Sequence, residues 1–193
     1  MKKFLLATFA VMCIGGVSFA QQTHFGLKAG INSSSVKISN GDDYDGKIGL
    51  HVGGLAHIHV SNHFAIQPEL VYSMQGGKGN GDSKLNLDYI NIPVLFQYMF
   101  DGGFRLQTGP QIGFLASAKS KNGNVTVDVD DDLASTDFSW TFGASYLFPG
   151  ADGLGADVRY NVGISNISDN NAFEAHNNVI QLGVFYQFMH KRR

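Results

Sequence analysis

The chain has almost no cysteine, and it lacks any excess of basic charge. Cys13 is the only cysteine and lies in an N-terminal segment that we expect to be removed, so the mature chain is predicted to hold neither a disulfide nor a thiolate metal ligand. The 14 lysines and arginines stand against 16 aspartates and glutamates, so the global basic field of a nucleic-acid-binding protein is missing. Nucleic acid is therefore not expected as a partner.

Long apolar runs are also missing after the first twenty residues. Residues 1–20 are interpreted as a signal peptide, because two lysines precede an apolar run and Ser18-Phe19-Ala20 offers a cleavage site ahead of Gln21. No later run approaches the roughly 20 apolar residues that a membrane-spanning helix requires. These observations exclude a helical membrane protein and predict one domain in residues 21–193.

What the chain does contain is a repeated alternation of apolar and polar residues. Eight segments show this period of two, which is typical of strands that separate two unlike environments. The predicted strands are 24–32, 47–60, 64–75, 85–100, 104–116, 137–148, 154–165 and 178–188. Leu85 and Leu87 fall on the polar parity of their strand, and we expect a β-bulge near Asp88 to return them to the apolar face.

The connections between these strands alternate in length. Segments 33–46, 76–84, 120–135 and 166–176 are long, whereas segments 61–63, 101–103 and 149–153 are short. This asymmetry is typical of transmembrane barrels with short periplasmic turns and longer extracellular loops, and a spanning sheet must close because its edges cannot be satisfied in lipid. We therefore predict an all-β fold, an eight-stranded antiparallel up-and-down transmembrane β-barrel in the cell outer membrane.

Aromatic residues at the strand ends favour a membrane over water outside the barrel. A girdle of phenylalanines is expected beside the short turns, formed by Phe25, Phe64, Phe100, Phe104, Phe148 and Phe188. A second belt beside the long loops would contain Tyr72, Phe114, Phe138 and Trp140. The rival fold, a soluble barrel of lipocalin type, would turn the apolar face inward, where side chains of this bulk do not fit.

Several short motifs, in this order and spacing, resemble those of PorT-like outer-membrane β-barrel domain proteins. They are Phe25-Gly26-Leu27-Lys28-Ala29-Gly30-Ile31-Asn32, Gln67-Pro68-Glu69-Leu70-Val71-Tyr72, Tyr89-Ile90-Asn91-Ile92-Pro93-Val94-Leu95, Gly109-Pro110-Gln111-Ile112-Gly113, Asp157-Val158-Arg159-Tyr160-Asn161 and Gln181-Leu182-Gly183. The resemblance covers nearly the whole mature chain. It implies an eight-stranded barrel in the outer membrane and brings no catalytic residues.

The last strand resembles the C-terminal signal by which such barrels reach their assembly machinery. The residues that carry this likeness are Gln181, Gly183, Tyr186 and Phe188. The signal normally ends a chain, whereas residues 189–193 follow it here as a short basic tail.

Six charged residues fall on the polar, inward parity. They are Lys28, Glu69, Arg105, Asp137, Asp157 and Arg159. Charges inside a narrow barrel are tolerated when they are paired. Because Glu69 and Arg159 each lie five residues beyond a turn-side strand end, we expect them at similar depth. The set predicts a salt-bridged polar plug, with a gated ion path as the alternative.

Two further clusters are candidate cation sites. His24, His57 and His59 are expected at the periplasmic mouth with His63 close by, either as polar lining or as a metal site. Segment 128–132 resembles the start of a calcium loop but lacks its glycine and terminal glutamate, so a solvated acidic loop is expected, with divalent-ion bridging to lipopolysaccharide as the alternative. No metal ion or cofactor is predicted.

The leading functional hypothesis is a non-enzymatic outer-membrane barrel with a structural or envelope-interaction role. Its expected partners are outer-membrane lipid and lipopolysaccharide, the barrel assembly machinery during biogenesis, and an unidentified envelope protein. Two alternatives stay open: a narrow transport or ligand-binding barrel, and a lipid-modifying enzyme active at the rim. The third hypothesis lacks a Ser-His-acid spacing near the long loops, where His51 and His176 are the histidines.

Overall fold

Antiparallel strands make up most of the computed structural model, which describes residues 23–39, 44–79, 83–123, 125–129, 133–167 and 174–188. The strands are β1 (Thr23–Ile38), β2 (Tyr44–His59), β3 (Phe64–Lys78), β4 (Ser83–Met99), β5 (Phe104–Asn122), β6 (Val125–Asp128), β7 (Thr136–Leu147), β8 (Leu154–Gly163) and β9 (Ala175–Gln187). Within the described part of the chain, no helix is long and apolar enough to cross a membrane.

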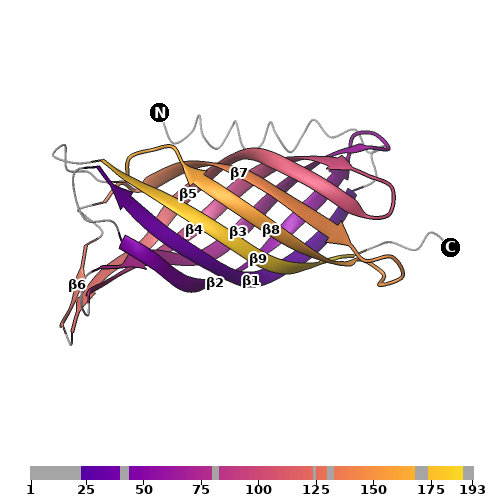
Figure 1. Ribbon diagram of the computed structural model, residues 1–193. Coiled ribbons are helices and arrows are strands. Elements are labelled where there is room, and N and C mark those ends of the chain that lie inside the picture. The colour runs from indigo at the N-terminus through magenta and orange to yellow at the C-terminus, as the bar shows by residue number, and fades with distance from the viewer. Residues whose placement is uncertain are drawn as a thin grey trace, which may run out of the picture.

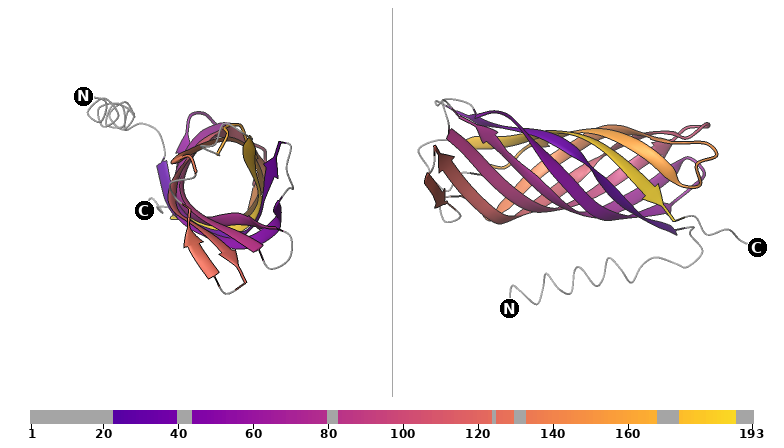
Figure 2. Two further views of the ribbon diagram at one scale, coloured as in Figure 1. Left: turned by 90° about the vertical axis from the view of Figure 1, so that its left-hand side faces the viewer. Right: turned by 90° about the horizontal axis from the view of Figure 1, so that it is seen from below.

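Eight of these strands close into a barrel. The neighbour order is β4-β3-β2-β1-β9-β8-β7-β5, and pairing of β4 with β5 closes the ring (Figure 1; Figure 2, left). Strand β6 stays outside the ring, because it pairs only with the far end of β5. Each ring strand pairs antiparallel with both neighbours, so the predicted eight-stranded antiparallel β-barrel is confirmed.

The two faces of the sheet have opposite polarity. Along β1, His24, Lys28 and Asn32 are buried inside the barrel, whereas Phe25 is 65% exposed and Leu27 is exposed with it. The same alternation runs through the other ring strands, with apolar side chains outward and mostly polar side chains inward, although Leu55, Leu95 and Phe185 also face inward. A soluble barrel has the reverse arrangement, so this polarity is the one that a membrane-spanning barrel requires.

Short turns and long connections lie at opposite ends of the barrel (Figure 1). Between β4 and β5 the chain reverses at Gly102 and Gly103, whose φ angles of 88° and 95° favour glycine. At the loop end, β1 continues to Ile38 and β5 to Asn122, so the expected ends at residues 32 and 116 are too early. Strands β1 to β5 are longer than β7 to β9. Beyond them, β6 forms a hairpin with β5 within the expected loop 120–135 (Figure 1).

The expected bulge exists, but its effect on Leu85 and Leu87 is the reverse of the prediction. The register shifts where Asp88 pairs with Ser117 and Tyr89 pairs with Leu115, so the extra residue belongs to β5 and not to β4. The side chains of β4 therefore alternate between the two faces without interruption. Leu87 is fully buried inside the barrel and Leu85 packs against the same interior cluster.

Candidate functional site in the barrel interior

An ion pair spans the barrel at mid-height. The Arg159 guanidinium on β8 donates two hydrogen bonds to the Glu69 carboxylate on β3, of 2.7 Å to Oε2 and 2.8 Å to Oε1. Three strands separate β3 from β8 in either direction around the ring, so these residues project from opposite walls. A bidentate guanidinium–carboxylate pair fixes both distance and orientation. The pair therefore ties the two walls together across the lumen.

Lys28 and Asp157 complete a central charge cluster with this pair. Lys28 Nζ lies 3.2 Å from Asp157 Oδ2 and 3.4 Å from Glu69 Oε2, and Arg159 also donates to Asp157 at 3.3 Å. All four side chains are at most 3% exposed. Two positive and two negative charges balance, which is the condition under which ions are tolerated away from bulk water. The formal charges of the cluster sum to zero.

Gln67, which the sequence did not single out as a site residue, supports the cluster. Gln67 Nε2 donates to Glu69 Oε1 at 2.7 Å, and Gln67 Oε1 lies 3.2 Å from His57 Nδ1. His51 lies beside the cluster, because a Cβ on Gly183 would be 3.1 Å from His51 Nε2 and 3.2 Å from Asp157 Oδ1. Gln67 stands two residues before Glu69 on the same face, which is the signal by which it could have been found.

Arg105 and Asp137 lie apart from the central charge cluster. Arg105 is near the turn end, where both terminal nitrogens approach Gln187 Oε1 at 3.5 Å. Asp137 is near the loop end and accepts hydrogen bonds from Ser165 Oγ at 2.9 Å and Asn177 Nδ2 at 3.5 Å. Neither forms an ion pair with a residue that the structure describes. The structure thus brings together four of the six inward charges, and amide and hydroxyl groups hold the other two.

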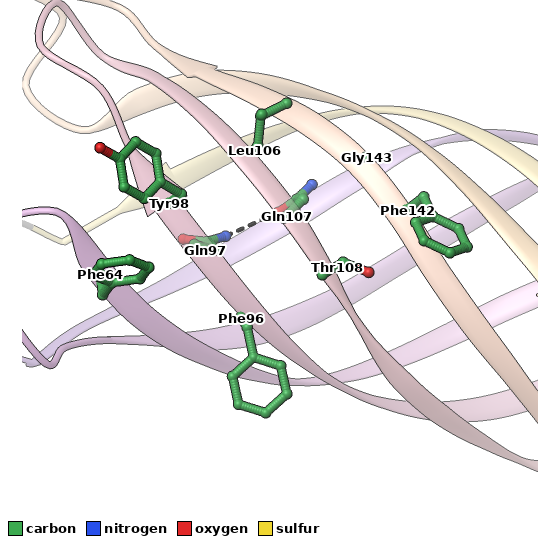
Figure 3. Close-up of a pocket in the computed structure, with 9 residues that line it drawn as sticks. All are labelled: Phe64, Phe96, Gln97, Tyr98, Leu106, Gln107, Thr108, Phe142 and Gly143. Atoms are coloured by element: carbon green, nitrogen blue, oxygen red, sulfur yellow. Dashed lines mark hydrogen bonds between the residues drawn. The ribbon is translucent and has the colours of Figure 1, made fainter.

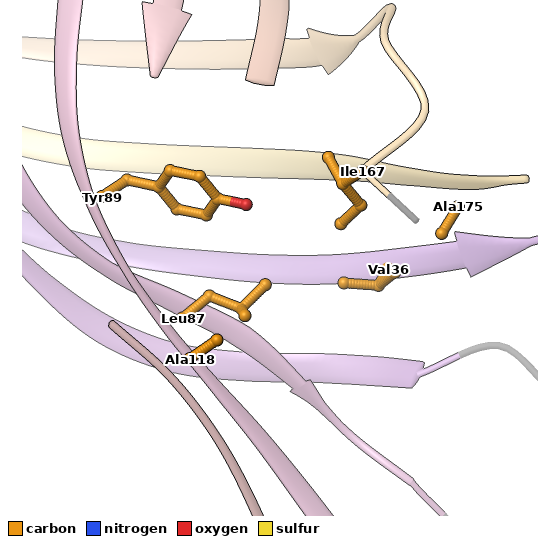
Figure 4. Packing of buried hydrophobic residues seen from close by; sticks show 6 residues of the cluster. All are labelled: Val36, Leu87, Tyr89, Ala118, Ile167 and Ala175. Carbon is orange, nitrogen blue, oxygen red and sulfur yellow. The ribbon is translucent and has the colours of Figure 1, made fainter. Parts of the chain in front are cut away.

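An apolar cluster fills the interior beneath the loop end. This mouth cluster contains Val36, Leu87, Tyr89, Ala118, Ile167 and Ala175 (Figure 4). All are at most 4% exposed, and Ile167 enters it from the connection after β8. Backbone hydrogen bonds hold that connection in place, from Ala134 N to Ile167 O and from Ile167 N to Ala175 O. The interior therefore holds two buried clusters, one of charges at mid-height and one of apolar side chains near the mouth.

The histidines at the turn end contact one another through ring edges. His24 lies directly opposite His57, and the rings of His57 and His59 are 4.6 Å apart at 90°. Among the described residues, no group of three or more histidine, cysteine, aspartate or glutamate side chains is placed to hold a metal ion. His63, expected to join this group, instead stacks on Tyr98 on the outer face, with ring centroids 6.2 Å apart.

The six phenylalanines expected in the turn-side girdle are all exposed on the outer face. Phe64, Tyr98, Phe100 and Phe104 form a continuous series of ring contacts there, with centroids 4.7 to 5.6 Å apart. Of the expected loop-side belt, Tyr72, Phe114, Phe138 and Trp140 are likewise exposed. The two sets of aromatic residues lie at opposite ends of the outward face.

Strand β9 joins the two ends of the ring. It pairs with β1 on one side and β8 on the other. Gln181 is buried inside, Tyr186 is exposed outside, and Phe188 N donates to Phe25 O at 2.7 Å. The tail 189–193 and residues 1–20 lie outside the described residues.

A hollow of about 450 Å³ lies on the outer face between β3, β4, β5 and β7. Figure 3 shows the rings of Phe96, Tyr98 and Phe142 around it, while Gln97 and Gln107 are hydrogen-bonded to each other at 2.9 Å. The hollow opens toward lipid, and none of the residues that line it carries a carboxylate, an imidazole or an amine. It therefore offers mainly apolar contact, with the Tyr98 phenol as its one titratable group.

Near the loop end, Ser165 and His176 lie close together without forming a catalytic pair. Ser165 Oγ donates to Asp137 and accepts a 2.7 Å hydrogen bond from Phe138 N. His176 Nδ1 lies 3.0 Å from the backbone oxygen of Ser165 and not from its hydroxyl. A nucleophilic serine needs its base at the hydroxyl, so this arrangement is a set of structural hydrogen bonds.

The acidic segment 128–132 is only partly within the described residues, since residues 130–132 lie outside them. Asp128 ends β6 and lies 4.0 Å from Lys119 Nζ, with 74% of its side chain exposed. An exposed pair at this distance contributes little to stability.

Outward apolar side chains, inward polar side chains and a closed ring of eight strands define an integral outer-membrane β-barrel. The model of the outer membrane protein beta-barrel domain family matches residues 19–169. The chain belongs to this family, and it is located in the outer membrane. A comparison with curated proteins found no match.

Two solved structures are similar to the chain in fold. Neisserial surface protein A is 13% identical with a TM-score of 0.59, and the alignment covers 84% of this chain and 96% of that one. Ail, the attachment invasion locus protein of Yersinia pestis, is 14% identical with a TM-score of 0.54, covering 86% and 99%. At such identities the likeness shows the fold alone.

Proposed function

We propose that the protein is a non-enzymatic barrel with a closed interior, which serves a structural or interaction role in the cell envelope through its exposed surfaces. The observation that carries this proposal is the Glu69–Arg159 pair, which connects opposite walls at 2.7 and 2.8 Å. The buried mouth cluster supports it as well, because its packed apolar side chains lie nearer the loop end. The surfaces that remain for contacts with the envelope are then the outer face, the loops and the turns.

Conductance tests the closed interior. The mature chain is refolded, inserted into planar bilayers, and compared with the variants Glu69→Gln and Arg159→Gln. We expect no discrete current from the wild type, and none from either variant, because the mouth cluster remains in place. Discrete ion current through the wild type that changes in the variants would support the narrow transport barrel and overturn the closed-interior role.

The finer assignments are part of the same proposal. Resemblance to PorT-like proteins rests on the motifs of β1, β3, β4, β5, β8 and β9. Removal of residues 1–20 as a signal peptide rests on the two lysines, the apolar run that follows them and Ser18-Phe19-Ala20. Delivery by the barrel assembly machinery rests on the closing strand with Tyr186 and Phe188. Sodium dodecyl sulfate gel mobility with and without heating, and N-terminal sequencing of the mature chain, test these assignments.

A further inference from the structure

Three lysines form a row across the outer face of strands β3, β4 and β5. Lys78 on β3 is the direct cross-strand partner of Lys84 on β4, and Lys84 is the direct partner of Lys121 on β5. All three are exposed. Lys84 has the parity of lipid-facing Ile90, whereas Leu85 between them faces inward. We call these three residues the lysine row.

The lysine row places like charges side by side on paired strands. Directly opposed residues on paired strands have Cβ atoms roughly 5 Å apart, and like charges in that position destabilise a sheet. None of the three lysines forms an ion pair with any residue in the described ranges. The neighbouring Lys119 differs, because it lies 4.0 Å from Asp128. Asp88 lies on the same face of β4, four residues from Lys84.

The lysine row lies just beyond the lipid-facing band. On β3, Lys78 follows exposed Met74 by four residues, which is about 13 Å along the strand and roughly 9 Å along the membrane normal at the usual tilt. Lysine stems can lie along apolar surface while the ammonium group reaches a polar layer. This height corresponds to the headgroup layer on the loop side.

We propose that the lysine row binds the phosphate groups of lipopolysaccharide in the outer leaflet. The inference deepens the envelope role proposed above, on which it rests, by naming a partner and its contact surface. Phosphate oxygens accept charge-assisted hydrogen bonds from ammonium groups. One bound phosphate can neutralise two adjacent lysines, which removes the repulsion within the row. The contact needs no divalent cation, unlike the bridging considered for segment 128–132.

The test measures lipid A retention by the refolded mature chain in native mass spectrometry. The triple variant Lys78→Gln, Lys84→Gln, Lys121→Gln removes the row, and Lys37→Gln removes an exposed lysine of β1 as a control. We expect at least tenfold weaker retention of bisphosphorylated lipid A in the triple variant and no change in the control. Dephosphorylated lipid A should bind the wild type as weakly as the triple variant binds the phosphorylated form.

Equal retention by wild type and triple variant, or equal retention of both lipids by the wild type, would overturn the proposal. Heat-modifiable gel mobility verifies folding, and in zwitterionic detergent the triple variant should be at least as stable as the wild type. If the triple variant does not fold, the single variant Lys84→Gln removes the central lysine. It should still lower the retention of bisphosphorylated lipid A at least threefold. A conducting wild-type barrel that keeps row-dependent binding would contradict the closed-interior role alone.

Discussion

Arg159 and Glu69 join opposite walls of the barrel through two hydrogen bonds of 2.7 and 2.8 Å. They lie 90 residues apart in the chain, and three strands separate β3 from β8 in either direction around the ring. Lys28 and Asp157 balance the charge of the pair, so removal of one member leaves an uncompensated ion among buried groups. The arrangement links stability to closure of the lumen.

The outward face is tested by placing a charge at mid-height. Val158 is 46% exposed on β8, between Ala144 of β7 and Leu182 of β9. Val158→Arg should lower the free energy of unfolding by roughly 2–4 kcal/mol, because the charge enters lipid near the midplane. Urea titration in lipid vesicles measures this loss.

Leu154→Arg is the control for Val158→Arg on the same strand and face at a different depth. Leu154 lies on the same face of β8, at its turn-side end, where the expected loss is about 0–1 kcal/mol. Equal, small losses at both positions would mean that the outward face does not contact lipid.

Gly143 is a position where the interior needs a glycine. A Cβ there would lie 2.5 Å from Val158 O and 2.9 Å from Arg159 Cγ. Gly143→Ala should therefore displace the guanidinium stem and cost about 1–3 kcal/mol. Chemical denaturation in the same vesicles provides the measurement.

Gly54→Ala is the matched substitution on the outer face. Its Cβ would meet only Gly26 O at 3.8 Å, so we expect no loss, or a gain of up to about 1 kcal/mol. A loss at Gly54 as large as that at Gly143 would contradict the assignment of crowding to the interior.

Leu87 tests the mouth cluster. It is fully buried with Tyr89, Ala118 and Ile167. Leu87→Ala should cost about 2–5 kcal/mol, because it leaves a cavity among packed side chains. A loss below about 0.5 kcal/mol in equilibrium unfolding would instead place Leu87 on the surface, as its expected return to the apolar face implied.

The closed ring, its two faces and their polarity could be predicted from the sequence. The period of two and the lengths of the connections can both be read from residues that are neighbours in the chain. Glu69 and Arg159 were expected at similar depth for the same reason. That they meet depends on closure and register around eight strands, which decide which walls are opposite. Gln67 was missed because its role follows from that juxtaposition.

The rule of outward apolar and inward polar side chains, which held within the membrane, did not predict the loop end of the barrel. Beyond the lipid the outward face no longer needs apolar residues, and interior positions near the mouth exclude water instead. Leu85 and Leu87 therefore face inward, on the same side of β4 as the polar interior residues further along the strand. Ile167 fills the mouth from a connection with no periodicity of its own, so only the packed structure reveals its place.

A double-mutant cycle on Glu69 and Arg159 tests the central claim most directly. Each single variant, Glu69→Gln or Arg159→Gln, leaves one buried ion unbalanced and should cost about 3–5 kcal/mol. The double variant leaves Lys28 and Asp157 paired at 3.2 Å, so it should lose much less than the sum of the two.

The expected coupling energy is at least about 2 kcal/mol, whereas the exposed pair Lys119→Gln with Asp128→Asn should give less than about 1 kcal/mol. Coupling between Glu69 and Arg159 as small as that of the exposed pair would contradict an ion pair that crosses the lumen.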